Sequence, residues 1–429
     1  MTARPRLKDI PKGFQFTALA CGIKKTGGLD LALIASDRPA SAAAVFTTNL
    51  VQAAPVVVSR FHLQASPSRM RAIIVNSGNA NCCTGREGMN AAKSTAAQIA
   101  SELNCKPDEV IVCSTGVIGV PMNAEKILRA APALAKSLRA DPAGFATFTR
   151  AIMTTDTRPK WAATRCRIGG RTVRLLGCAK GAGMIHPQMA TMLAFVLTDA
   201  AIAPSLLRRA LREVTARTFN CITVDGDTST NDTLAVLANG ASGAPRISRH
   251  SPLTTRNSFV SALEEVCRSL ALAIVADGEG AQRVVEIEVR GARSNRDADH
   301  IARTIAHSPL VKTALAGADP NWGRILAAAG RSGVKFNPDH TRIWLAGISV
   351  FRDGRPLDFD ERAAHQAMLS KHVSIVVDLG ERAAEGKSKF QTRKSGITRH
   401  SPLVIRHSAR IYTCDFTADY VRINASYRT

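Results

Sequence analysis

The chain has 429 residues, of which 45% are hydrophobic and 21% are charged. This balance excludes disordered and fibrous classes, and charged and proline interruptions between Met189 and Leu207 argue against a membrane-spanning helix. The ten cysteines form no CxxC pair, so we expect reduced thiols rather than a zinc site or a disulfide framework. The first residues lack the apolar run of a secretory signal, which predicts a cytoplasmic protein.

The net charge of +23 raises the alternative of a basic RNA-binding protein. Two stretches without acidic residues, 245–258 and 386–410, contribute ten of the excess positive charges, and aromatic residues for base stacking make up only 5%. The two stretches share a near repeat, at 247–253 and 397–403. We interpret them as insertions in surface loops, where added length costs little entropy, with a peptide-binding motif as the alternative. We therefore expect no nucleic-acid partner.

Strand and helix signals alternate along the chain. Apolar or alternating runs predict strands at 72–75, 110–113, 283–290, 345–351 and 374–378, and helical periodicity predicts helices at 89–103, 204–217 and 258–275. Pro204 stands at a favourable first helical position. The sequence predicts an α/β fold with mixed or antiparallel sheets. Neither GxGxxG after a strand nor GxxxxGK[ST] occurs, so no nucleotide-binding loop is expected.

The segment Lys180–Leu193 joins a glycine-containing loop to an apolar run, with Ala190 and Thr191 at the junction. From the residues alone, this pattern fits a loop that enters a buried strand. It also fits self-cleavage, in which the Thr191 hydroxyl attacks the Ala190 carbonyl and hydrolysis frees a new N-terminus. The released α-amine, with an ordinary pKa of about 8, then serves as the base for the threonine hydroxyl. Both interpretations remain open on this pattern.

Eight ordered motifs resemble the ornithine acetyltransferase family, the bifunctional glutamate N-acetyltransferases of arginine biosynthesis. They are 75–81, 114–119, 153–157, 180–193, 224–232, 277–280, 317–324 and 420–429. The similarity extends over nearly the whole chain, and it favours Thr191 as a catalytic nucleophile. It implies a layered, αββα-like self-processing fold. It also implies cleavage after Ala190 into an alpha chain, 1–190, and a beta chain, 191–429.

The resemblance implies a ping-pong reaction in which Thr191 takes acetyl from N-acetylornithine and passes it to glutamate. No cofactor or metal is implied, and acetyl-CoA is a further donor for some members of the family. The two fragments are expected to stay associated in a heterotetramer of two alpha and two beta chains. The alternative enzyme is an N-terminal-nucleophile aminopeptidase or amidase of related fold, in which water accepts the acyl group.

The family's site residues carry over onto matching positions. Thr115 and Gly116 match the oxyanion hole, which stabilises the tetrahedral intermediate with preplaced donors. The substrate-binding positions besides Thr191 are Thr154, Lys180, Glu279, Asn424 and Thr429.

Other polar residues near these motifs receive structural interpretations. His186 is interpreted as a loop residue rather than a general base, because the threonine amine already supplies one. Asp225, Asp227 and Asp232 are interpreted as turn and packing groups. The chain departs from the family pattern after Gly280, where Ala281-Gln282-Arg283 replaces the usual Ala-Thr-Lys, which puts the positioning of Glu279 in question.

Overall fold

The computed structural model describes residues 6–186, 192–380 and 407–425. These residues form two compact units, an N-terminal unit that runs to Glu279 and a C-terminal unit over Gly280–Ala425. The boundary differs from the predicted fragment boundary, because Leu193 pairs with Lys180 inside the N-terminal unit. The predicted cleavage site Ala190–Thr191 and the predicted contact Thr429 lie outside the described residues, as does 386–406 of the second basic stretch.

Eight strands of the N-terminal unit form one sheet, in the order β4-β3-β2-β8-β7-β6-β5 with β1 beside β2. Their bounds are β1 Phe14–Leu19, β2 Leu31–Phe46, β3 Met70–Asn79, β4 Val110–Val117, β5 Lys160–Ile168, β6 Arg171–Lys180, β7 Leu193–Thr198 and β8 Thr233–Ala238. β2 pairs with β3 through its first half and with β8 through its second half, with a register shift between Ala35 and Ala40. This long strand therefore connects the two halves of the sheet.

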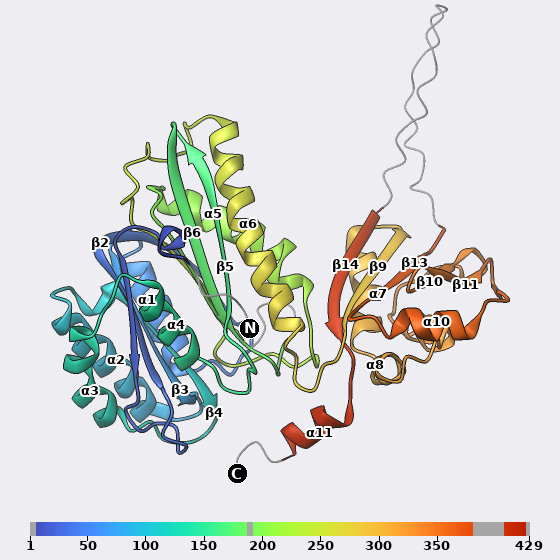
Figure 1. The fold of residues 1–429 in the computed structure, drawn as a ribbon, viewed down its shortest axis with the longest axis horizontal. Coiled ribbons are helices and arrows are strands. Elements are labelled where there is room, and N and C mark those ends of the chain that lie inside the picture. The colour runs from blue at the N-terminus through green and yellow to red at the C-terminus, as the bar shows by residue number, and fades with distance from the viewer. Residues whose placement is uncertain (1–5, 187–191, 381–406, 426–429) are drawn as a thin grey trace, which may run out of the picture. The chain divides into compact units, whose positions relative to one another are not determined.

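The two halves of the sheet share one apolar core. Side chains from β2, β3 and β4 pack in the same buried cluster as side chains from β6, β7 and β8, together with Phe145 and Phe148 of α4. The opposite face of the β3–β4 half is covered by α2 and α3, and α6 packs on β5 and β6. Figure 1 shows α2 and α3 on one flank of this unit and α5 and α6 on the other. The two halves of the sheet thus pack on each other and carry helices on their outer faces. This layered arrangement confirms the predicted fold class.

Three helices of the N-terminal unit, α2, α5 and α6, were predicted from their periodicity, and α1, α3 and α4 were not. They are α1 Ala54–Ala65, α2 Gly85–Glu102, α3 Ala124–Lys136, α4 Pro142–Ala151, α5 Pro204–Arg217 and α6 Leu253–Val275. α5 begins at the predicted proline, whose missing N–H leaves no unpaired donor at a first helical position.

The surface-loop prediction for 245–258 needs a correction. Ile247 is only 1% exposed and forms a β-bridge with Ile202, and the residues from Leu253 onward form the start of α6. The exposed turn is confined to 248–252. The buried Ile247 fixes one end of this short turn, and the start of α6 at Leu253 fixes the other end.

The C-terminal unit is a six-stranded sheet in the order β12-β11-β10-β13-β9-β14, in which only the β9–β13 pair is parallel. The strands are β9 Val284–Ala292, β10 Arg342–Leu345, β11 Ile348–Arg352, β12 Arg355–Pro356, β13 His372–Asp378 and β14 His407–Cys414. The helices are α7 Asn295–Ala306, α8 Pro309–Ala316, α9 Trp322–Gly330, α10 Glu361–Met368 and α11 Ala418–Asn424. Side chains of α7, α8 and α9 pack with the sheet in one apolar core.

Two predictions in this unit need correction. The predicted strand 345–351 is a hairpin, because Ala346 and Gly347 both adopt positive φ and form the tight turn between β10 and β11. Residues 407–410, predicted as the end of a basic insertion, are the first residues of β14 and pair with β9. No helix in the described part of the chain has the length and apolarity that a membrane span requires.

Candidate active site

The site is built where β3 and β4 end side by side. These strands run parallel, and Ser77 lies opposite Thr115 while Gly78 lies opposite Gly116. Gly116 has φ +132°, and a Cβ atom there would lie 2.3 Å from the Gly78 carbonyl carbon. Only glycine allows this backbone conformation and this close approach. The predicted oxyanion pair therefore stands on rigid strand ends.

Lys180 reaches this point from the end of β6. Its side chain is buried, and its Nζ donates to Thr115 Oγ1 at 3.1 Å and to Thr154 Oγ1 at 2.7 Å. Lys180 thus binds two other predicted site residues, which precede it by 65 and 26 positions in the sequence. Because the ammonium donates to both threonine oxygens, each hydroxyl hydrogen is left to point toward another acceptor.

Glu279 also belongs to this region. It is 6% exposed, its backbone N–H donates to Ala182 O at 2.9 Å, and a Cβ on Gly183 would lie 2.3 Å from its carboxylate. Glu279 thus lies against the loop that follows Lys180. The glycine at 183 leaves the space that the carboxylate occupies. The residues that depart from the family pattern, Gln282 and Arg283, donate from their backbone N–H groups to Asp415 within the C-terminal unit.

Burial and nearby charges set the electrostatics of the site. Burial lowers the pKa of Lys180, and the Asp156 carboxylate opposes that effect. Burial alone would raise the pKa of Asp156, but the charges of Lys180 and Lys160 and the hydrogen bond from Gly181 lower it to about 2. Asp156 is therefore a carboxylate at neutral pH. The Lys180 ammonium lies in a strongly desolvated but charge-compensated place.

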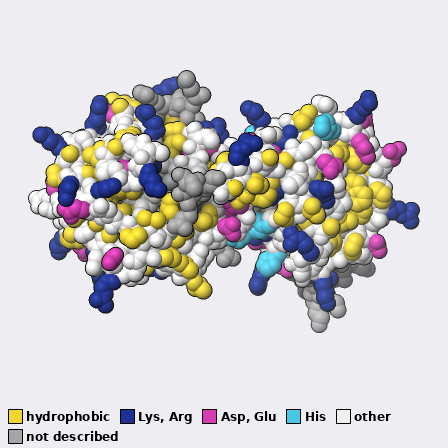
Figure 2. Space-filling model, turned by 90° about the horizontal axis from the view of Figure 1, so that it is seen from below, with side chains coloured by type: hydrophobic (Ala, Val, Ile, Leu, Met, Phe, Trp, Pro, Cys, Tyr) yellow, Lys and Arg dark blue, Asp and Glu magenta, His cyan; other side chains and the backbone are white. Residues whose placement is uncertain are grey.

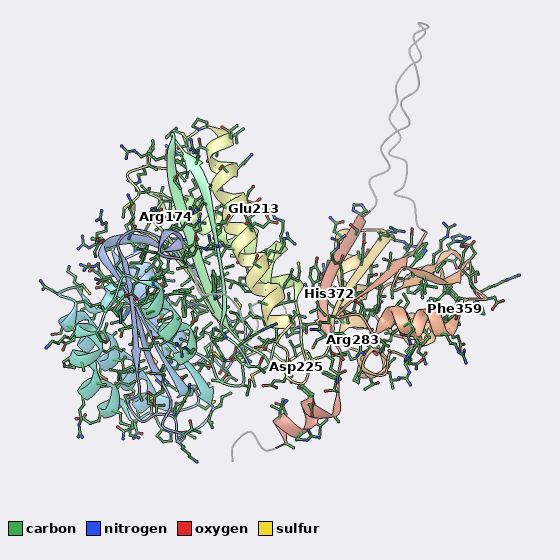
Figure 3. The ribbon with its side chains drawn as sticks, in the orientation of Figure 1. Arg174, Glu213, Asp225, Arg283, Phe359 and His372 are labelled. Carbon is green, nitrogen blue, oxygen red and sulfur yellow. The ribbon has the colours of Figure 1, made fainter. Side chains whose placement is uncertain are left out.

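The aspartates interpreted as turn and packing groups behave largely in that way. Asp225 accepts hydrogen bonds from the backbone N–H groups of Met184 and Ile185, and burial raises its pKa to about 6. Asp232 accepts from Met192 N at 2.9 Å, and burial raises its pKa well above the ordinary value. Figure 3 labels Asp225 in the loops of this unit. Within the described ranges, no cluster of three His, Cys, Asp or Glu side chains has the arrangement of a metal site.

Asn424 is the last residue of α11, in the C-terminal unit. It is exposed, and its side-chain amide donates to Tyr420 O in its own helix at 3.0 Å. This contact accounts for its local position and carries no evidence for a substrate contact. His186, which is half-buried, follows the Met184–Ile185 turn and stays interpreted as a loop residue.

Sequence reasoning missed several buried polar residues that organise the site. Asn231 donates through its amide to Ala80 O and Ser114 O, which ties the start of β8 to the ends of β3 and β4. Lys160, Asp156 and Asp277 form a buried ionic cluster. The only sequence signal for the cluster was that both aspartates stand in motifs shared with the family. Lys160 had none.

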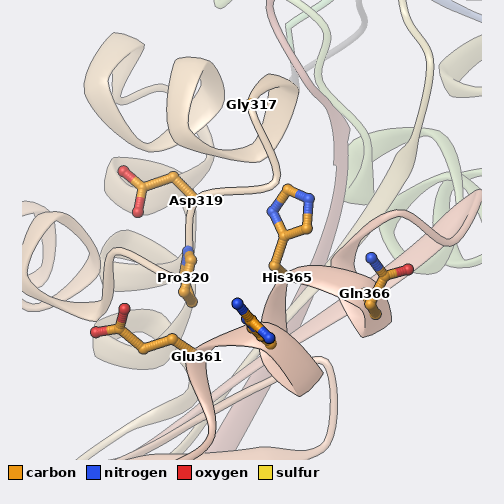
Figure 4. Close-up of a pocket in the computed structure, with 7 residues that line it drawn as sticks. Gly317, Asp319, Pro320, Glu361, His365 and Gln366 are labelled. Atoms are coloured by element: carbon orange, nitrogen blue, oxygen red, sulfur yellow. The ribbon is translucent and has the colours of Figure 1, made fainter.

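A separate cavity of about 640 Å³ lies in the C-terminal unit. Its lining, drawn in Figure 4, is Gly317, Asp319, Pro320, Glu361, Arg362, His365 and Gln366. The His365 ring binds Ala318 O through Nδ1, at 2.9 Å. None of the predicted site residues lines this cavity, which brings charges of both signs together at the 317–324 motif.

The basic side chains do not make an obvious nucleic-acid surface. Figure 2 shows Lys and Arg scattered singly over the visible face, with acidic and apolar side chains between them. Many of the arginines form ion pairs with acidic neighbours, such as Arg410 with Glu286 at 2.9 Å and Arg217 with Glu264 at 3.0 Å. On this face the basic side chains of the described residues are therefore spread out and do not gather into one patch.

Comparison with known proteins agrees with the motifs. The sequence matches the ArgJ family over residues 15–429. It is 46% identical over 421 residues to the arginine biosynthesis bifunctional protein ArgJ of Symbiobacterium thermophilum, with 98% of each chain covered.

Two solved structures are also similar. The arginine biosynthesis bifunctional protein ArgJ of Bacillus halodurans is 38% identical, with 54% of this chain and 98% of that chain covered and a TM-score of 0.47. The ornithine acetyltransferase of Mycobacterium tuberculosis, solved in complex with ornithine, is 32% identical, with 45% and 98% covered and a TM-score of 0.38.

The predicted resemblance to the ornithine acetyltransferases is confirmed by the family match and by the similarity to the Symbiobacterium protein. These findings favour the transferase interpretation over the aminopeptidase alternative. The chain therefore belongs to the ArgJ family, whose members include bifunctional enzymes of arginine biosynthesis.

Proposed function

We propose that this chain transfers an acetyl group from N-acetylornithine to glutamate through an acetyl ester on Thr191, which cleavage of the Ala190–Thr191 bond makes N-terminal. The observation that carries the proposal is the buried Lys180 ammonium bound to both Thr115 and Thr154. Lys180, the last residue of β6, pairs with Leu193 of β7. Leu193 follows Thr191 by two positions in the sequence. This pairing of β6 with β7 supports the proposal that Lys180 acts close to the N-terminus that cleavage would create.

The reaction needs two displacements. In the first, the Thr191 hydroxyl attacks the acetyl carbonyl carbon while the α-amine of Thr191 takes the hydroxyl proton. The amide C–N bond breaks, the proton passes to the leaving nitrogen, and ornithine departs. In the second, the α-amine of glutamate attacks the ester carbonyl and releases N-acetylglutamate and the free hydroxyl. No oxidant, metal or cofactor enters this balance.

The oxyanion formed in both displacements would be stabilised by Thr115 and Gly116. Lys180 donates to the Thr115 oxygen, so the Thr115 hydroxyl hydrogen is free to donate to the oxyanion. Such preplaced donors in a dry site commonly contribute about 10²–10³ in rate each. In the described part of the chain Lys180 uses two of its three N–H donors, so the third is left for a substrate oxygen.

Substrate recognition is proposed for Thr154, Lys180 and Glu279, which the N-terminal unit brings to one region. The Glu279 carboxylate suits the δ-ammonium of ornithine, because charge-assisted hydrogen bonds are the stronger kind. The proposed contributions of Asn424 and Thr429 are supported by the family resemblance alone. Acetyl-CoA as a second donor, the two-alpha, two-beta assembly and a cytoplasmic location are likewise carried by the resemblance and by the sequence.

Two measurements test this proposal. Intact mass under denaturing conditions is expected to show fragments split after residue 190, and Thr191→Ala is expected to remain whole. The matched control is Thr172→Ala, an exposed threonine at the other end of β6, which is expected to be cleaved normally. An uncleaved wild-type protein that transfers acetyl would overturn the self-cleavage step.

The second measurement separates transferase from hydrolase. Purified protein is incubated with N-acetylornithine, with and without glutamate, and acetate and N-acetylglutamate are quantified. The proposal expects N-acetylglutamate in proportion to ornithine released. Free acetate at the same rate with or without glutamate would instead support the aminopeptidase or amidase alternative.

A further inference from the structure

Three loops that carry proposed site residues are joined by one buried ionic cluster, which we name the Asp156–Lys160–Asp277 triad. The Lys160 ammonium lies 2.6 Å from Asp156 Oδ1 and 2.5 Å from Asp277 Oδ2. All three side chains are at most 3% exposed. Lys160 is the first residue of β5, and Asp277 follows the end of α6. The triad therefore links segments that are more than a hundred residues apart in sequence.

Each carboxylate also binds the backbone of a site loop. Asp156 accepts from Gly181 N at 2.6 Å through Oδ1 and from Thr154 N at 3.1 Å through Oδ2. Asp277 accepts from Thr157 N at 3.1 Å and from the Thr157 hydroxyl. Asp156 thus binds the backbone of Thr154 and of Gly181, the residue after Lys180. Asp277 stands two residues before Glu279 in the sequence.

A buried cluster of this kind is a poor way to stabilise a fold. Removing ions from water is costly, and apolar replacements of buried ion pairs are often neutral or stabilising. Here, however, the Asp156 carboxylate accepts from Lys160 and also from the backbone N–H groups of Gly181 and Thr154. Apolar side chains could not accept these backbone hydrogen bonds. The cluster therefore holds the loops that carry the proposed site residues in place.

The triad also faces Lys180 electrostatically. The charged groups that act on the Lys180 ammonium are the acidic Asp156, Glu279 and Asp232 and the basic Lys160 and Lys24. Of the acidic groups, Asp156 has the largest effect in raising the pKa of Lys180 against burial. Asp277 neutralises Lys160 rather than Lys180. Removal of the Asp156 charge should therefore change the pKa of Lys180, whereas removal of the Asp277 charge should act mainly on Lys160.

We propose that Asp156 is a positioning residue of the acetyl-transfer site, which aligns the loops of Thr154 and Lys180 and keeps Lys180 charged as a donor to Thr115 and Thr154. Asp156 does so without touching the substrate. The inference rests on the proposed function. It adds to that function a requirement for the Lys180 ammonium, so activity falls as pH rises through the pKa of that group.

The test compares Asp156→Asn with Asp277→Asn, because each variant removes one of the two carboxylates on Lys160. The control is Asp199→Asn, a buried aspartate paired with Arg174 at the opposite end of β7 from Leu193. For each protein, kcat/KM for transfer from N-acetylornithine to glutamate is measured across pH, together with the extent of cleavage by intact mass and the melting temperature.

In Asp156→Asn, we expect the alkaline limb of the pH profile to move to lower pH by about one unit or more, because a compensating charge is lost. Asp277→Asn is expected to keep the wild-type limb and to raise KM for N-acetylornithine, since it loosens the loop of Glu279. Asp199→Asn is expected to keep both. A loss of stability without a shift of the limb in Asp156→Asn would overturn the proposed role of Asp156.

Two further readouts keep the test decisive. If Asp156→Asn does not fold, Asp156→Glu, which retains the charge but lengthens the side chain, is expected to keep the limb and to lower kcat/KM at least tenfold. Wild-type kinetics in Asp156→Glu would then refute the positioning role. A wild-type protein that transfers no acetyl refutes the proposed function itself, whereas an active wild type with an unshifted Asp156→Asn variant refutes only the role of Asp156.

Discussion

Gly116→Ala tests the strand-end geometry on which the oxyanion pair depends. In the structure a Cβ at this position would lie 2.3 Å from Gly78 C, 2.5 Å from Asn79 N and 2.7 Å from Gly78 Cα. All three atoms belong to backbone, so no side chain can rotate away, and β3 and β4 must separate. The alanine would also have to adopt the φ of +132° that Gly116 has, a conformation that residues with a Cβ atom rarely adopt.

The magnitude follows from two terms. An L-residue held at such a φ costs about 1–3 kcal/mol, and overpacking of a rigid contact costs about 1–3 kcal/mol more. Together the two terms amount to about 2–6 kcal/mol. At roughly 2–4 °C per kcal/mol for a unit of this size, the melting temperature is expected to fall by about 4–24 °C. Displacement of the proposed oxyanion donor by about 1 Å is expected to lower kcat by about 10² or more.

The assay pairs calorimetry with initial rates, and Gly119→Ala is the matched control. Gly119 also has positive φ, +79°, but a Cβ there would meet no atom within 4 Å. It should therefore carry only the conformational cost of about 1 kcal/mol and retain most of the activity. If Gly116→Ala melts and turns over like Gly119→Ala, the close approach of β3 and β4 is not what holds the site.

Three other substitutions test packing and charge elsewhere in the N-terminal unit. The folded pKa of Asp225, about 6, lies above the unfolded value of about 3.9, so the free energy of unfolding should fall by about 1 kcal/mol as pH rises from 5 to 7. Denaturant titrations should show that Asp225→Asn lacks this pH dependence. An equal dependence in the variant would contradict the assignment. Phe148→Ala removes a fully buried side chain and should lower the unfolding free energy by about 3–5 kcal/mol in the same titrations; a loss below 1 kcal/mol would count against the core. In Gly177→Ala the new Cβ would lie 2.6 Å from Val266 and 2.9 Å from Leu270, so a loss of about 1–3 kcal/mol is expected, and a stabilised variant would mean that α6 does not pack tightly on β6.

Local signals in the sequence predicted some of the helices and strands, where a short-range pattern was strong. The helix at 204–217 was predicted with its observed bounds because Pro204 starts it and the apolar period of its buried face is short-range information. The strand prediction at 345–351 was wrong because Ala346 adopts a positive φ that alanine disfavours, and the tight hairpin imposes that conformation. The loop prediction at 245–258 was wrong in part because basic composition does not reveal that Ile247 is buried.

The sequence by itself determined the family, because ordered motifs survive as strings of residues, and it proposed Thr115, Gly116, Lys180 and Glu279 through that resemblance. Only the tertiary structure decided that Lys180 bonds Thr115 and Thr154 together. The same holds for the Asp156–Lys160–Asp277 triad, whose two acids lie on different loops and meet one lysine at a strand end. The physical reason is that burial and ion pairing depend on which distant segments the sheet brings together. Neither composition nor periodicity carries that information.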